Sequence, residues 1–183
     1  MSETTVDLPQ HVFTLFAVFR LSSSHPVVLD GRDVPGIVQE LEDVVDVIGD
    51  EGVTVRGWYD ASGLRSDADL MVWLRGGAGE DLQWALRELR RSSLLKPLIR
   101  TWGAVGVLDG SEAPDEEEPA LWLAVRAPDA PLETPSTLEA DDLSGLARLL
   151  ADHRLEGRHA AGVDAEVYVG RLIEPVEIIE VLQ

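Results

Sequence analysis

The feature that most constrains the fold is an alternation of apolar strands and amphipathic helices over the first 108 residues. Residues 11–20 form an apolar run rich in Phe and Val, which is typical of a buried strand. Apolar residues recur with helical spacing over 37–48, and Gly49 follows where a glycine commonly ends a helix. The other predicted elements are strands at 53–60, 69–75 and 102–108 and a helix marked by Leu82, Leu86 and Leu89. The order β-α-β-β-α-β predicts a ferredoxin-like unit of the α+β class.

The second part of the chain gives a shorter pattern. Residues 109–119 (DGSEAPDEEEP) carry six carboxylates and no positive charge, which predicts a solvated linker. A strand is predicted at 121–126, a loop at 129–137 and a final strand at 166–173, with a helix between them marked by Leu143, Leu146, Leu149 and Leu150. The second half therefore reads as β-α-β only. The predicted organisation is a first half over 10–108, a linker over 109–119 and a shortened second half over 120–183.

Composition excludes several classes of protein. The chain has 34 acidic and 15 basic residues, and a net charge of −19 repels phosphate backbones and anionic lipids, so we expect neither a nucleic-acid nor a membrane partner. It contains no cysteine, which excludes disulfides, thiolate metal sites and a cysteine nucleophile. No apolar run approaches 18 residues and residues 1–10 lack the layout of a signal peptide, which predicts a cytoplasmic protein.

Residues 53–73 (VTVRGWYDASGLRSDADLMVW) form the most specific stretch of the sequence. With FAVFR at 16–20 before it and the arginine- and leucine-rich pattern from 82 to 102 after it, this stretch resembles the chlorite dismutase family, and most of all its actinobacterial coproheme decarboxylases. The resemblance covers roughly residues 10–108. It implies two fused ferredoxin-like halves that form a dimeric α+β barrel, a ring-like oligomer, and haem or coproheme bound in the second half.

Two registers relate the second half to this family. In the first, residues 149–153 (LLADH) match the helix that carries the proximal haem ligand, so His153 would bind the haem iron. In the second, residues 138–143 (LEADDL) and 167–171 (VYVGR) match the family's last helix and strand, and the haem-ligand helix with its two following strands would be missing. The second register explains more residues with one deletion, and we favour it.

Under both registers the resemblance places the catalytic tyrosine on the strand at 121–126, which contains none. Tyr59 and Tyr168 match non-catalytic family positions, so no catalytic residue is assigned. The leading hypothesis is a non-catalytic oligomeric partner or regulatory or scaffold subunit, assembled with itself or with a full-length paralogue. The alternative is a haem- or coproheme-binding oxidoreductase or porphyrin carrier, with His153 as axial ligand and Arg126 pairing with a propionate. A cofactorless small-molecule binder ranks third.

Other polar clusters have simpler interpretations. Asp60, Asp67 and Asp69 could suggest a carboxylate metal site, but the family resemblance places them in the DASGLRSDADL loop between two strands, which implies turn and cap hydrogen bonds, with Arg65 paired to one of them. The glycines at 76–79 match no phosphate-binding pattern and predict a plain turn. An incomplete second half leaves a sheet edge that needs cover, which also predicts an oligomer.

Overall fold

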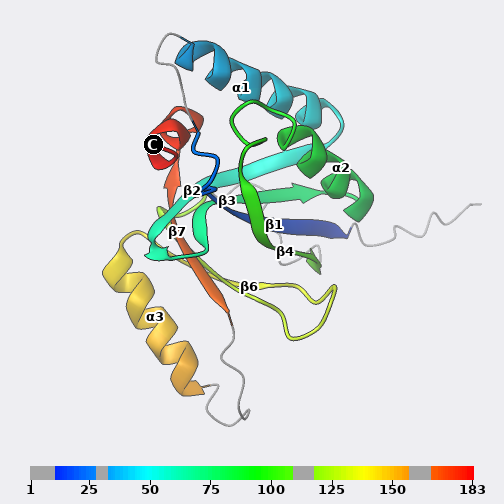
Figure 1. The fold of residues 1–183 in the computed structure, drawn as a ribbon. Coiled ribbons are helices and arrows are strands. Elements are labelled where there is room, and N and C mark those ends of the chain that lie inside the picture. The colour runs from blue at the N-terminus through cyan, green and yellow to red at the C-terminus, as the bar shows by residue number, and fades with distance from the viewer. Residues whose placement is uncertain (1–10, 28–32, 109–117, 157–165) are drawn as a thin grey trace, which may run out of the picture.

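The computed structural model describes residues 11–27, 33–108, 118–156 and 166–183. Its first half contains six elements in the predicted order: β1 (Val12–Arg20), α1 (Val34–Asp50), β2 (Val53–Arg65), β3 (Ala68–Gly76), α2 (Gly79–Leu89) and β4 (Ile99–Leu108). Its second half contains β5 (Trp122–Arg126), β6 (Ser136–Ala140), α3 (Leu143–Glu156), β7 (Val167–Ile173), the short 3-10 helix η2 (Pro175–Glu177) and α4 (Ile178–Val181). The chain is therefore a mixed α+β protein, as predicted (Figure 1).

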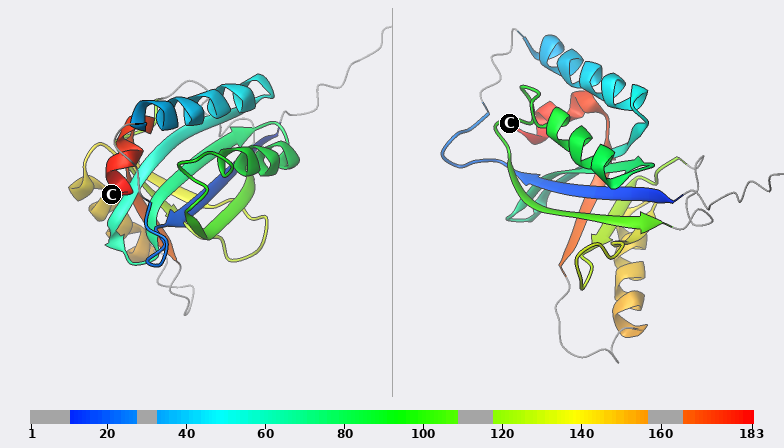
Figure 2. Two further views of the ribbon diagram at one scale, coloured as in Figure 1. Left: turned by 45° about the horizontal axis from the view of Figure 1, so that its top comes forward. Right: turned by 90° about the vertical axis from the view of Figure 1, so that its right-hand side faces the viewer.

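All seven strands belong to one antiparallel sheet with the order β4-β1-β3-β2-β7-β5-β6. The two halves join where β2 pairs with β7, at Trp58–Ile173, Tyr59–Leu172 and Asp60–Arg171. The sheet curls, so that β5 and β7 cross beneath β1 and β4 (Figure 2). The predicted linker falls largely on residues 109–117, which lie outside the described residues.

The prediction that the second half is β-α-β only is wrong, because the structure contains a third strand there. β6 lies in the segment that was assigned partly to a loop, and it pairs with β5 from Trp122–Ala140 to Arg126–Ser136. β6 has one large apolar residue and occupies the edge of the sheet, so its own sequence carries a weak strand signal. Its strand conformation is provided by the apolar neighbour β5.

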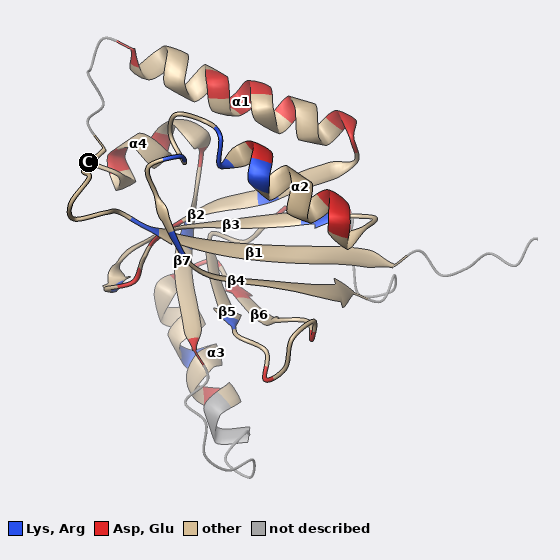
Figure 3. Ribbon diagram, turned by 45° about the vertical axis from the view of Figure 1, so that its right-hand side comes forward, with Lys and Arg blue, Asp and Glu red and all other residues tan. Residues whose placement is uncertain are grey.

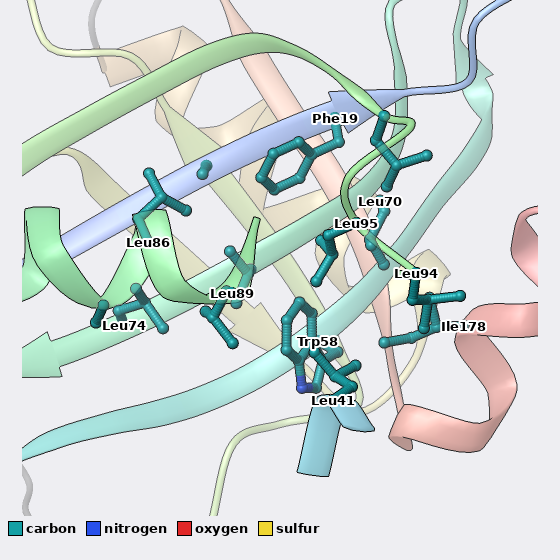
Figure 4. Packing of buried hydrophobic residues seen from close by; sticks show 14 of the residues in the cluster. Phe19, Leu41, Trp58, Leu70, Leu74, Leu86, Leu89, Leu94, Leu95 and Ile178 are labelled. Carbon is teal, nitrogen blue, oxygen red and sulfur yellow. The ribbon is translucent and has the colours of Figure 1, made fainter. Parts of the chain in front are cut away.

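Each face of the sheet supports a separate apolar core. On one face α1, α2 and α4 cover β1, β2 and β3, and Leu41, Leu89 and Ile178 meet there with almost no exposed surface (Figure 4). The other face forms the inside of the curl. Its buried side chains come from both halves: Phe16, Val18, Tyr59, Ala61, Ala68, Met71, Trp73, Leu123, Val125 and Tyr168. This second group, called the inner cluster below, holds the two halves together.

The loop between β5 and β6 returns to the far edge of the sheet. The backbone N–H of Val107 on β4 donates to Thr134 Oγ1 at 3.1 Å, and the Thr134 hydroxyl donates to the Val107 carbonyl. A side chain on Gly106 would collide with the Thr134 backbone, so glycine permits this close approach. The curl is thus closed by a loop contact. Within the described residues, no helix is both long and apolar enough to cross a bilayer.

Candidate functional site

Tyr168 lies at the centre of an aromatic and charged arrangement inside the curl. Its ring stacks on Trp102 of β4 with a centroid separation of 4.9 Å and an interplanar angle of 26°. The guanidinium of Arg65 on β2 lies 4.4 Å from the centroid of the same ring, within range of a cation–π interaction. Burial, with the nearby Glu166 carboxylate, raises the pKa of Tyr168 to about 12, so the phenol is neutral at physiological pH.

Arg65 is itself fixed by the loop between β2 and β3. Its Nε and Nη2 donate to the two carboxylate oxygens of Asp67 at 2.7 and 2.8 Å, and Nη1 donates to the Val167 carbonyl at 3.4 Å. The hydrogen bond to Arg65 lowers the pKa of the Asp67 carboxyl. This confirms the predicted pairing of Arg65 with a neighbouring aspartate. Arg65 and Asp67 thus stabilise the junction between β2 and β7. The hydrogen-bond donors of Arg65 are already used by other residues of the same chain.

Asp60 stabilises its own turn, as predicted, whereas Asp69 makes a long-range hydrogen bond instead of the predicted turn or cap bond. Asp60 accepts hydrogen bonds from the backbone N–H and the hydroxyl of Ser62. Asp69 accepts one from the Leu21 backbone N–H at 2.6 Å. In the part of the chain that the structure describes, no three His, Cys, Asp or Glu side chains gather as metal ligands would.

Tyr59 is the second buried phenol, and its surroundings differ from those of Tyr168. The side chain has no exposed surface, and its hydroxyl finds no hydrogen-bond partner among the described residues. Burial raises the pKa of Tyr59 well above its usual value of 10; Glu139 adds to the shift, while Arg56 and Arg75 oppose it. Both arginines lie against the neighbouring Trp73 ring, at 5.4 and 4.7 Å from its centroid. Tyr59 is therefore held neutral, and no described residue satisfies its hydroxyl.

We expect Tyr59→Phe to leave the free energy of unfolding unchanged or to raise it by about 1 kcal/mol, because it removes a buried hydroxyl that lacks a partner. The same variant should lose less stability at high pH. Unfolded tyrosine titrates near pH 10, whereas the folded pKa of Tyr59 is higher, so the folded state binds more protons as pH rises above 10 and stability falls. Urea unfolding at pH 7 and pH 10.5 measures both effects. A loss above 1 kcal/mol at pH 7 would show that the hydroxyl has a partner.

His153 and Arg126, the two predicted haem-binding residues, lie toward the outer face of the second half. Leu123 and Val125 point into the inner cluster, so Arg126 points to the opposite face, where α3 packs on β5 and β6. His153 is seven residues beyond Leu146 on α3, and therefore on the same side of that helix. The His153 side chain is exposed and Arg126 is half-buried. No hydrogen bond between described residues joins the two side chains.

The glycine turn at 76–79 is a turn between β3 and α2, as predicted. α2 begins at Gly79, and its first turn carries Glu80 and Asp81, which favour the positive end of the helix dipole. Two carboxylates at this helix start disfavour a bound anion there.

A protein-family comparison identifies the chain. The sequence model of the family described as chlorite dismutase matches residues 35–129, just over half of the 183 residues. The chain belongs to the chlorite dismutase family. The resemblance predicted from residues 53–73 and their flanks is confirmed.

Individual members of the chlorite dismutase family show how far the likeness extends. The coproheme decarboxylase of Mycolicibacterium smegmatis is 30% identical over 110 residues, which cover 60% of this chain and 46% of the relative. The chain thus spans about half the length of the curated relative that it matches. Chlorite dismutase from Candidatus Nitrospira defluvii has the same fold. A tryptophan variant of it with cyanide gives a TM-score of 0.72 at 17% identity, and its imidazole complex 0.69 at 16%, each covering 94% of this chain and 95% of the other.

The fold raises the question whether the described residues fit a haem on the α3 side of the sheet. α3 rests directly on the sheet, because Leu146 is fully buried and a Cβ on Gly145 would lie 3.7 Å from that of Ala140. A porphyrin between helix and sheet would have to separate them. An exposed His153 also lacks the enclosed apolar surroundings in which small-molecule ligands bind. The described residues of a single chain therefore do not enclose a haem between α3 and the sheet.

Proposed function

We propose that this protein is a non-catalytic, oligomer-forming member of the chlorite dismutase family that acts as a structural or regulatory partner of itself or of a full-length paralogue. The observation that carries the proposal is the position of its two tyrosines. Tyr59 is enclosed in the inner cluster, and Tyr168 is stacked on Trp102 and Arg65. Neither phenol is available for chemistry on a bound substrate, and β5, where the family resemblance expects a reactive tyrosine, has none.

We further propose how the second half relates to the first. β1 pairs antiparallel with β3 and β4, and β5 pairs antiparallel with β6 and β7. On this basis β5, β6, α3 and β7 correspond to β1, β3, α2 and β4 of a ferredoxin-like half. Counterparts of α1 and β2 are then missing from the second half. This correspondence makes α3 the last helix of the half, in agreement with the second register, and leaves the family's haem-ligand helix without a counterpart.

The oligomer part of the proposal rests on surfaces that one chain leaves uncovered. β4 and β6 are the two edges of the sheet. On α3, Leu143 and Leu149 are 42% and 41% exposed. Exposed edges and apolar stripes are commonly covered by another subunit.

Two measurements on the purified chain test the proposal. Light scattering after size-exclusion chromatography should show an oligomer, and incubation with coproheme and hydrogen peroxide should leave the coproheme unconverted. Conversion of coproheme by this chain alone would overturn the non-catalytic role. A monodisperse monomer that also fails to co-elute with a full-length paralogue would overturn the role in assembly.

A haem- or coproheme-binding protein with His153 as axial ligand is the second candidate. One observation favours it: His153 and Arg126 belong to the side of the second half on which α3 packs. It requires α3 to lift from the sheet, or a second chain to enclose the site. A titration of the protein with haem b and with coproheme separates the candidates. A saturable Soret shift that His153→Ala abolishes would support this candidate, and no shift with either porphyrin would exclude it.

A further inference from the structure

β4 offers an open backbone edge. It is the last strand of the sheet and is hydrogen-bonded to β1 along one side. The outward backbone groups of Val107 are taken by Thr134. Gly103 and Val105 share the orientation of Val107, because alternate residues of an antiparallel strand point their N–H and C=O the same way. Among the described residues, the backbone of neither residue has a hydrogen-bond partner on this outer side. The edge near Gly103 and Val105 can therefore accept another strand.

An apolar groove of about 820 Å³ runs along this open edge. Its apolar walls come from both faces of the sheet and from α2: Phe13, Leu15, Phe16, Leu86, Trp102 and Val105. Leu132, from the β5–β6 loop, also lines the groove; it is 74% exposed and has a φ of +67°. A leucine with a left-handed backbone conformation is strained, and its exposed apolar side chain adds a second unfavourable feature. Strained residues of this kind concentrate at binding sites.

The two ends of the groove carry charges of opposite sign. α2 connects β3 to the parallel strand β4, so it runs antiparallel to β4 and its start lies near the end of β4. Glu80, which lines the groove, is at that end. Arg100, at the start of β4, lines the groove at the other end and is exposed. The end of α2 adds the exposed Arg87 and Arg90, and Glu88 there is paired with Arg91. Figure 3 shows acidic positions at the start of α2 and basic positions toward its end. The open edge thus has an acidic end and a basic end.

We infer that this edge is the contact surface for a second copy of the chain, with the two β4 strands antiparallel about a two-fold axis. Antiparallel pairing brings the basic end of each copy against the acidic end of the other, so the charges match twice. Association through α1 is disfavoured, because residues 34–50 carry acidic side chains and no lysine or arginine. The inference deepens the proposed function, on which it rests, by naming the surface through which assembly occurs.

The test compares Val105→Pro with Val105→Thr in the full chain. The Val105 N–H points away from β1, so proline removes an outward donor and leaves the β1–β4 ladder intact, as proline on an edge strand does. Threonine is nearly isosteric with valine and keeps the N–H. Because the symmetry removes two hydrogen bonds at once, we expect Val105→Pro to weaken dimerisation about tenfold or more relative to Val105→Thr, measured by sedimentation equilibrium. Circular dichroism confirms that both variants are folded.

A charge exchange tests the orientation independently. R100E and E80R should each weaken the dimer, since each places like charges together at both ends. A 1:1 mixture of the R100E chain with the E80R chain should restore it as a heterodimer, because both contacts then join opposite charges. A monomeric wild type overturns the inference. An oligomer that Val105→Pro and the charge reversals leave unchanged also overturns it, while the proposed role in assembly stands.

Discussion

Replacing Gly170 with alanine should destabilise the fold by about 3 kcal/mol, near the upper end of the range for overpacking. Gly170 lies on β7, next to the strand pair that joins the halves. A Cβ at this position would lie 2.7 Å from Tyr59 Cβ and 3.2 Å from the Asp60 carbonyl oxygen. Both contacts involve atoms close to or in the backbone of β2, so no side-chain rotation relieves them. The two strands must move apart, and the inner cluster opens with them.

Urea unfolding monitored by tryptophan fluorescence measures this effect. The matched control is Gly49→Ala, where a Cβ meets nothing within 4 Å; α1 runs on to Asp50 and does not end at Gly49 as predicted, so this position is helical. Because alanine is the better helix former, the control should be neutral or more stable by about 0.5–1 kcal/mol. A Gly170→Ala variant as stable as the wild type would mean that β7 does not pair closely with β2, and that the two halves are joined in some other way.

The first half could be predicted because its central strands β1 and β3 are covered on both faces. From Thr14 to Phe19, β1 is continuously buried, with helices on one side and the inner cluster on the other. Burial on both sides produces an unbroken apolar run, which is a strong strand signal. The apolar spacing similarly predicts the helix α1; the structure buries Leu41 and Ile48 of the predicted face, together with Val38, which the spacing did not include.

The second half was harder because its strands depend on partners that local sequence does not specify. β6 is polar and lies at an edge, so its sequence predicts a loop over its first residues and no strand. The pairing of β2 with β7 links residues more than 100 positions apart, and nothing in the spacing of either segment identifies the other. β2 also extends to Arg65, five residues beyond the predicted strand, because the hairpin to β3 continues the pairing at Arg65–Ala68.

The arrangement around Tyr168 was missed for the same reason. Its members Arg65, Trp102 and Tyr168 come from β2, β4 and β7, and only the curl of the sheet brings them together. One signal was available in the sequence. In residues 167–171 (VYVGR), successive side chains point to opposite faces of the sheet, so Tyr168 lies on the face opposite Val167 and Val169. That face is the one that points into the curl. His153 illustrates the converse: a motif match identified a residue type, and the structure leaves that side chain exposed near the end of α3.

Leu146→Ala should have the second large effect, a loss of about 2–4 kcal/mol in the free energy of unfolding. Among the described side chains of α3, Leu146 is the one that is fully buried. It therefore supplies most of the apolar contact by which the helix is held on β5 and β6. Truncating it should release α3 before the rest of the fold, because the two large cores lie elsewhere. Hydrogen exchange should then show lost protection over 143–153 at denaturant concentrations where β1 and β3 remain protected.

Leu149→Ala is the control on the same helix. Leu149 is 41% exposed, so its truncation should change stability by less than about 0.5 kcal/mol. The comparison of the two variants also tests whether a porphyrin could enter between α3 and the sheet. A Leu146→Ala cost no larger than that of Leu149→Ala would mean that α3 is not seated on the sheet, and the space between helix and sheet would then be open to a porphyrin beside His153. A large difference between the two variants would mean that Leu146 fills the space between α3 and the sheet. It would thereby support the proposed role in assembly over haem binding.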